Sequence, residues 1–461
     1  MRFVAKALQW LVMLAFAAIA GVFIWLYVAP PALIRVGTGY SAKIVCSNSF
    51  LASRPGEGVL ATDVQAPGHP LLKYVGVSVD PVARTVSASL LRVLGESRAV
   101  YRPGLGCVSV PDGGAVQLAP LPPPAMPNMA AFWPAGERTE LSQDPALAAV
   151  LDDVRLTGPG MRAVVVVRNG RIVGERYGEG FDDTTPLLGW SMTKTVNAAI
   201  IGTLVGEGRL SLDQNDLFER WGMDERSEIT IAHLMAMSGG LEFDEDYGDV
   251  TDVTRMLYLE SDMADFAANK PLTARPGGRF SYSSGTAVML SRIWQDAFDD
   301  PAEALAWPRE RLFGPLGMTS AVLEADASGT FVGSSYMYAT ARDWARFGEF
   351  LRREGRWDML DGAGNYVEQA ILPDGFVSWM REPAPASAGV YGRGQLWLKG
   401  PGESDADAEL PADAFWLRGH DGQSITIIPS RSLVVVRLGL TPGSLAYRPQ
   451  PMVSAILSAL E

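Results

Sequence analysis

The distribution of hydrophobic residues divides the chain into stretches of clearly different pattern. The first, Ala7 to Ala29, is apolar except for Gln9, and as a helix it would span the roughly 30 Å hydrocarbon core of a bilayer. Short runs such as YVGVSV and VSASLL follow and indicate strands. The proline-dense stretch APLPPPAMPNMAAFWPAGE then favours an extended path, because proline cannot continue a helix. From about residue 137 onward, strand and helix patterns alternate without interruption.

This last stretch predicts one large domain whose sheet is built from both of its ends. A helix is expected near residues 144–154, followed by apolar runs at 164–168 and 171–177. Asn169-Gly170 between these runs favours a two-residue hairpin turn, because both turn positions need positive φ. Two further strands are expected in SITIIPSRSLVVVRLGL, and a final helix in QPMVSAILSALE. Since the middle is mostly helical, we predict an α/β (α+β) fold: an antiparallel sheet flanked by helices, plus a large helical region.

The apolar N-terminal stretch predicts a transmembrane helix. Arg2 and Lys6 precede it and should stay on the cytoplasmic side, which sends the remaining chain outward. The alternative is a cleaved signal peptide, because Ala18-Ile19-Ala20 has the small-x-small form of a cleavage site. The predicted organisation is a cytoplasmic tip (1–6), a transmembrane helix (7–29), a small extracytoplasmic segment (30–118), a proline-rich linker (119–136) and the large domain (137–461).

Composition and charge exclude several classes of function. A net charge of −13 leaves no basic stripe to neutralise phosphates, so we expect no nucleic-acid partner. With three histidines, two cysteines, no HExxH and no CxxC, we expect no metal. No Walker loop and no GxGxxG opens a helix after a strand, so no nucleotide cofactor is expected.

The two cysteines suggest one disulfide. If the body of the protein is exported, Cys46 and Cys107 lie in an oxidising compartment, where a bond between them would close a long loop. The alternative is two independent buried thiols.

The stretch GWSMTKT (residues 189–195) places a lysine where helix electrostatics disfavour one. Only six of the 39 lysine and arginine residues are lysines, yet Lys194 lies in the first turn of a helix predicted from Ser191 to Glu207. Residues three apart share a helix face, so Ser191 and Lys194 point the same way. A serine hydroxyl becomes a good nucleophile when a neighbour takes its proton. A buried lysine can do so and an arginine cannot.

Alone this motif is weak, but two other stretches add to it. Tyr282-Ser283-Ser284 precedes a predicted helix in RPGGRFSYSSGTAVML, and a tyrosine near the lysine can relay protons to a leaving group. Near the C-terminal strands, LRGHDGQSITIIP is a glycine-rich turn that can present backbone N–H donors.

With these motifs the sequence resembles the penicillin-recognising serine hydrolases, which include class C β-lactamases, D-alanyl-D-alanine carboxypeptidases, related esterases and 6-aminohexanoate-dimer hydrolases. The resemblance covers about residues 140–461, is closest to the last branch, and includes HLMAMSGGL and GHDGQ before IIP. It implies a β-lactamase/transpeptidase-like fold and a small-molecule amide or ester substrate. It further implies that Ser191 is acylated, that Lys194 is its base, and that Tyr282 is the second proton-transfer group. Ser284 takes the place of the usual asparagine.

The third motif of this superfamily, Lys-Thr-Gly or His-Thr-Gly, is not present as such, and two registers remain open. In one, His420 supplies the side chain and the Gln423 N–H lines the oxyanion hole. In the other, preferred register, Gly422 matches a later family glycine, Leu417-Arg418-Gly419 forms the motif, and the His420 N–H lines the hole. Ser284, His420, Gly422 and Gln423 are therefore the candidate substrate and oxyanion residues. In the preferred register Arg418 should face away from the site.

The resulting expectation is a serine hydrolase with its catalytic domain in the periplasm, held by a single helix in a bacterial inner membrane. One alternative is a β-lactamase or D-alanyl-D-alanine carboxypeptidase, which would need a cationic third motif. Another is a binding or sensor module without turnover. A Ser-His-Asp arrangement is disfavoured, because His420 and Asp421 would point to opposite faces of a strand. The acidic run from Glu242 to Asp249 either lines the cleft or forms a solvated loop.

Overall fold

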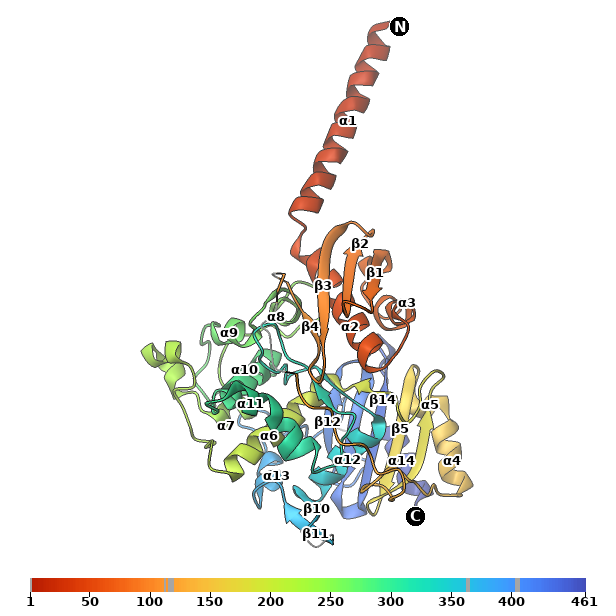
Figure 1. The fold of residues 1–461 in the computed structure, drawn as a ribbon, viewed down its shortest axis with the longest axis vertical. Coiled ribbons are helices and arrows are strands. Elements are labelled where there is room, and N and C mark those ends of the chain that lie inside the picture. The colour runs from red at the N-terminus through yellow and green to blue at the C-terminus, as the bar shows by residue number, and fades with distance from the viewer. Residues whose placement is uncertain (1, 112, 115–119, 362–364, 403–406) are drawn as a thin grey trace. The chain divides into compact units, whose positions relative to one another are not determined.

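The computed structural model describes residues 2–111, 113–114, 120–361, 365–402 and 407–461. These form two compact units (Figure 1). The first contains residues up to Tyr101, Cys107–Gly114 and Asp246–Ser261, and the second contains the rest. Met1 of the expected cytoplasmic tip and residues 115–119, where the expected extracytoplasmic segment meets the expected linker, lie outside the described residues.

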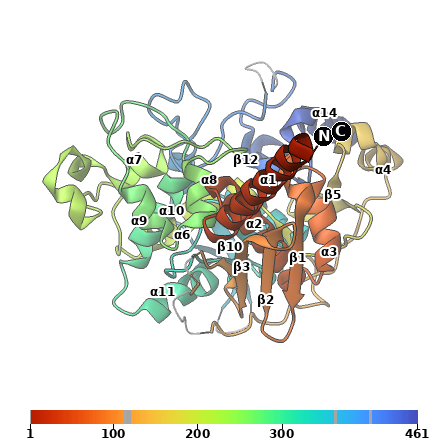
Figure 2. The same cartoon turned by 90° about the horizontal axis from the view of Figure 1, so that it is seen from above.

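The first unit combines helices with a sheet in the order β1-β2-β3-β4, of which β1, β2 and β3 pair antiparallel and lie side by side in Figure 2. Its helix α2 packs against β1, β2 and α8. Within the described residues, α1 alone is long and apolar enough to cross a membrane, and a signal sequence would pass the same test. The elements are α1 (Arg2–Val28), α2 (Ala32–Leu51), α3 (Gly56–Val59), β1 (Val75–Asp80), β2 (Thr85–Leu90), β3 (Leu94–Arg102), β4 (Gly106–Ser109) and α8 (Asp252–Leu259).

A disulfide joins Cys46 in α2 to Cys107 in β4, as the sequence predicted. Both cysteines are fully buried, so the bond crosses the interior between helix and sheet.

The second unit has the predicted architecture, an antiparallel sheet in the order β12-β13-β14-β5-β6 with a large helical region. Its strands come from the two ends of the unit, and the hairpin turn at Asn169-Gly170 has positive φ at both positions. The strands of this sheet are β5 (Met161–Arg168), β6 (Arg171–Tyr177), β12 (Phe415–Gly419), β13 (Gln423–Ile428) and β14 (Leu433–Gly439).

Helices cover both faces of this sheet (Figure 1). Because side chains alternate along a strand, Val434 faces α12 near Gly348, while its neighbour Val435 packs on the side of α4 and α14. The covering helices are α4 (Pro145–Asp152), α12 (Ala341–Arg352) and α14 (Gln450–Ala459). The fully buried valines of β5 and β14 reflect this double cover.

The helical region surrounds α6, which is buried from Thr193 to Leu204. Such a helix is apolar on nearly all sides and needs neighbours all round. Its surroundings include α10 and the segment before α12. The remaining elements are α5 (Val154–Thr157), α6 (Thr193–Gly206), α7 (Ile231–Met235), α9 (Met263–Ala268), α10 (Ser284–Gln295), α11 (Pro301–Pro308), α13 (Phe376–Met380), β7 (Leu187–Leu188), β8 (Val322–Leu323), β9 (Met337–Ala339), β10 (Arg356–Leu360) and β11 (Tyr366–Ala370).

The disulfide generates a stability prediction. It links residues 61 apart in sequence, so replacing both cysteines by serine should lower the free energy of unfolding of the first unit by about 2–4 kcal/mol, because the unfolded chain regains loop freedom. Denaturant unfolding with and without reductant measures the difference. The double variant should be insensitive to reductant. If the oxidised wild type is no more stable than the variant, the bond contributes nothing.

Candidate functional site

Ser191 and Lys194 lie where the chain enters α6. A single 3-10 turn, Trp190–Met192, leads into the helix, whose first regular residue is Thr193. Ser191 is half-buried and Lys194 is 1 % exposed. The Lys194 Nζ donates a hydrogen bond to the Ser191 Oγ at 3.1 Å. The spacing seen in the sequence therefore brings the hydroxyl and the amine into direct contact.

The backbone is strained directly before Ser191. Trp190 has φ +48°, a left-handed conformation that bulky side chains rarely adopt. Its ring packs 6.0 Å from that of Tyr336 and 5.7 Å from that of His420, centroid to centroid. A Cβ on the preceding Gly189 would lie 2.2 Å from the Trp344 ring. Dense packing thus imposes the turn that presents the Ser191 hydroxyl.

Three further groups surround the buried Lys194 amine. Its Nζ donates to the Ser284 Oγ at 3.1 Å and to the Ser334 carbonyl oxygen at 3.0 Å. It also lies 4.6 Å from the centroid of the Tyr282 ring, a cation–π distance. The three sequence-predicted residues Ser191, Lys194 and Tyr282 are thereby brought together, with Ser284 beside them.

Tyr282 is held by an aromatic cluster. Its ring lies 5.9 Å from that of Tyr391 and 5.4 Å from that of Trp397. Tyr391 is fully buried, and burial raises the pKa of its hydroxyl well above the usual value. The next residue, Ser283, caps α10 by accepting a hydrogen bond from the Thr286 N–H. The cap fixes the start of α10 directly after Tyr282, whose ring meets Lys194.

One residue of the site was not singled out in the sequence, although lining the cleft was one of the two alternatives for its acidic run. Glu245 accepts hydrogen bonds from the Ser284 N–H at 2.7 Å and from the Ser284 hydroxyl at 2.5 Å. Burial raises the pKa of the Glu245 carboxyl, and the charge of Lys194 opposes that rise. In the sequence Glu245 lies within the acidic run 242–249, and no spacing to another motif distinguishes it from the other acidic residues there.

The third-motif residues lie at the end of β12 and in the turn after it. Gly419 ends the strand, and a Cβ there would lie 2.3 Å from the Gly189 carbonyl oxygen, so this backbone touches the segment before Ser191. His420 follows in the turn, beside Trp190. The Gly422 carbonyl accepts from Arg437, and the Gln423 side chain donates to carbonyls of the turn and to Gly439. Gly422 and Gln423 thus shape the turn, and the register in which Leu417-Arg418-Gly419 is the third motif stays a prediction.

Two expectations about this region were wrong. Arg418 does not turn away from the site: its guanidinium lies 4.1 Å from the centroid of Trp397, the ring that packs on Tyr282, and burial lowers its pKa. His420 and Asp421 do not point to opposite faces, because Asp421 has φ +56° in a turn rather than a strand, and the His420 Nε2 lies 3.4 Å from its Oδ1.

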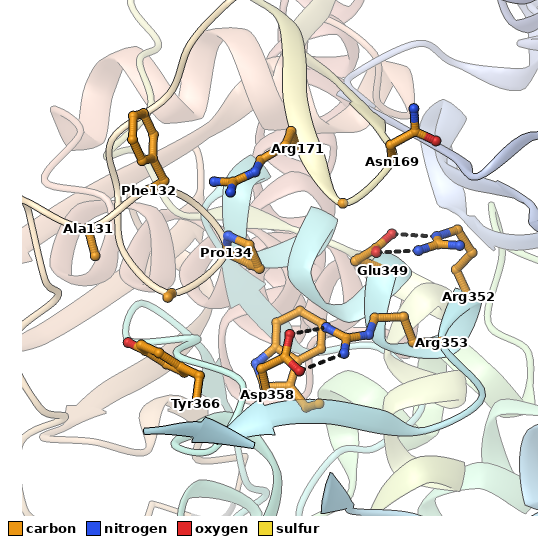
Figure 3. A pocket seen from close by; sticks show the side chains of 13 residues that line it. Ala131, Phe132, Pro134, Asn169, Arg171, Glu349, Arg352, Arg353, Asp358 and Tyr366 are labelled. Carbon is orange, nitrogen blue, oxygen red and sulfur yellow. Dashed lines mark hydrogen bonds and ion pairs between the residues drawn. The ribbon is translucent and has the colours of Figure 1, made fainter. Parts of the chain in front are cut away.

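A separate cavity of about 490 Å³ lies beside the β5–β6 hairpin, between α12 and the segment around Phe132 (Figure 3). Its arginines Arg352 and Arg353 are paired with Glu349 and Asp358, so their charges are already neutralised. None of the residues that the structure describes forms a group of three or more His, Cys, Asp or Glu side chains suited to a metal ion.

Comparison with known proteins assigns the chain to a family. The model of the Beta-lactamase family matches residues 154–450, which is more than half of the chain. The chain belongs to the beta-lactamase family. It is therefore a β-lactamase-related hydrolase with the β-lactamase/transpeptidase-like fold, as the sequence predicted.

Solved structures of other proteins show the same fold at low identity. The "Putative 6-aminohexanoate-dimer hydrolase from Bacillus anthracis" is 24 % identical, with a TM-score of 0.53 over 79 % of this chain and 90 % of that one. EstCE1, "a hydrolase with promiscuous acyltransferase activity", is 16 % identical, with a TM-score of 0.50 over 69 % of this chain and 99 % of that one. A search of curated proteins finds no match.

The contact between Gly419 and Gly189 predicts that the site tolerates no side chain there. Gly419→Ala suits the local φ of −124°, but its Cβ would push β12 away from Ser191. A displacement of about 1 Å should lower kcat/KM for a p-nitrophenyl ester about hundredfold without unfolding the protein. Gly443→Ala is the matched control, because no atom lies within 4 Å of its Cβ. Equal activity of the two variants would show that this contact does not position the site.

Proposed function

We propose that this protein hydrolyses small-molecule amides or esters through an acyl-enzyme on Ser191. The observation that carries this proposal is the buried amine of Lys194, whose Nζ lies 3.1 Å from the Ser191 Oγ and is held by the Ser284 Oγ and the Ser334 carbonyl oxygen. A group that removes the proton from a serine must be within hydrogen-bond reach of it, and this amine is.

In the proposed first step, the neutral Lys194 amine accepts the Ser191 proton as the Ser191 Oγ attacks the substrate carbonyl carbon. Tyr282, whose ring lies against the Lys194 amine, donates its hydroxyl proton to the leaving nitrogen or oxygen and receives in its place the proton that Lys194 took from Ser191. Lys194 is then the neutral amine again. Water then attacks the acyl-enzyme with the same base, which releases the acid and restores Ser191.

The negative oxygen of the tetrahedral intermediate needs hydrogen-bond donors. We assign this role to the backbone N–H groups of Ser191 and His420. Support comes from Gly419, whose backbone touches that of Gly189 and so brings the residue after β12 beside the nucleophile turn. Losing one such donor in a serine hydrolase typically costs a factor of about 10²–10³.

We further propose that α1 anchors the protein in a bacterial inner membrane with the hydrolase domain in the periplasm. Support comes from the 26-residue apolar span Phe3–Val28, from the positive charges of Arg2 and Lys6 at its N-terminal end, and from the disulfide, which suits an oxidising compartment.

The nucleophile assignment predicts a complete loss of function on removing one oxygen atom. Ser191→Ala should abolish both turnover of a p-nitrophenyl ester and covalent labelling by a fluorophosphonate probe, because the probe reacts with an activated serine. Mass spectrometry of the labelled wild type should place the adduct on the peptide containing Ser191. Labelling of the alanine variant at the wild-type rate would reject the assignment.

The anchor predicts the location and the length of the mature protein. Full-length protein should sediment with membranes and resist extraction by high salt, and protease added to spheroplasts should digest its body. A variant lacking residues 1–29 behind a cleavable export signal should instead be soluble in the periplasm. Recovery of a shortened soluble form from the unaltered chain would show that the N-terminal helix is a signal sequence.

A further inference from the structure

The Ser284 hydroxyl connects Lys194 to a carboxyl group. It accepts a hydrogen bond from the Lys194 Nζ at 3.1 Å and donates one to the Glu245 Oε1 at 2.5 Å. The other carboxyl oxygen of Glu245 accepts from the Ser284 N–H at 2.7 Å. Two bonds from one residue thus fix the carboxyl group at the end of a line from Ser191 through Lys194 and Ser284.

We propose that Glu245 is a positioning residue that takes up the ammonium proton of Lys194 through the Ser284 hydroxyl, leaving Lys194 as the free amine that activates Ser191. The inference rests on the proposed function. The ammonium proton moves to the Ser284 Oγ as the hydroxyl proton of Ser284 moves to the Glu245 Oε1. A charged pair becomes a neutral amine and a neutral carboxyl group, and the number of protons is unchanged.

Ser284 is suited to this transfer because one oxygen atom both accepts and donates. Asparagine, which the superfamily usually has here, accepts through its oxygen and donates through its nitrogen, so it could not pass a proton by the same short exchange. The Ser284 hydroxyl and the Glu245 carboxyl group therefore form one proton-transfer path.

The surroundings of Glu245 favour the protonated form. Burial disfavours its charged form and raises the pKa of the carboxyl, and Asp244 acts in the same direction. Lys194 opposes both, and Tyr391 and Tyr282 are the titratable groups packed nearby. Transfer of the proton removes two buried charges together, which is favourable where water is excluded.

The pH dependence of acylation tests this inference, with Glu245→Gln as the main variant. In the wild type Lys194 and Glu245 together hold one proton in the active enzyme, and activity is lost only when this pair binds a second proton at low pH. In the glutamine variant the side-chain amide cannot take up a proton, so the path from Lys194 through Ser284 is broken. The acid limb of the pH profile for fluorophosphonate labelling should therefore move up by one unit or more. Near that limb labelling should be roughly tenfold slower, with recovery at alkaline pH.

Three further variants make the result specific. Glu242→Gln removes the same charge from an exposed position in the same segment and should leave the profile unchanged. Ser284→Ala should move the acid limb in the same direction as Glu245→Gln, whereas Ser284→Thr keeps the hydroxyl and should retain the wild-type limb.

Two results would overturn the inference while the proposed function stands. In Glu245→Gln the acid limb of the labelling profile could stay where it is in the wild type, or the labelling rate could fall by the same factor at every pH. If Glu245→Gln fails to fold, the comparison of Ser284→Ala with Ser284→Thr decides alone. Absence of labelling in the wild type would reject the proposed function, and this inference with it.

Discussion

A lysine side chain that is almost fully buried must find hydrogen-bond acceptors, and the arrangement around Ser191 follows from that requirement. The acceptors come from three parts of the chain: the turn before α6, the start of α10 and the segment containing Ser334. A buried ammonium without partners would cost several kcal/mol. The packing of α10 and of the Ser334 segment against α6 is therefore constrained by the amine as well as by apolar contact.

The same requirement explains the aromatic cluster beside the site. A positive charge is stabilised by the face of an aromatic ring, and Tyr282 provides that face. Tyr391 and Trp397 pack against the Tyr282 ring, and the Arg418 guanidinium packs on Trp397.

Local patterns in the sequence were enough to predict the sheet, its hairpin and the helix carrying Lys194. Valine runs around Asn169-Gly170 and the spacing from Ser191 to Lys194 depend only on neighbours along the chain. Glu245 and Arg418 could not be placed in this way. Their environments are created by residues distant in sequence, and a carboxylate within an acidic run looks the same whether buried or solvated. The orientation of Asp421 depended on whether its segment was strand or turn, and the left-handed backbone there settled it. Nothing in the sequence indicated that Asp246–Ser261 would pack with the N-terminal unit.

The order of strands in the large sheet has a consequence for when the protein becomes complete. β5 pairs with β6, the next strand made by the ribosome, but its other neighbour, β14, is made near the end of synthesis. β12, which touches the turn before Ser191, is also made late. The nucleophile and its lysine are therefore translated long before the strand that closes their site. An emerging chain carries these reactive groups without the finished surroundings, and the central sheet cannot close until almost the whole polypeptide is available.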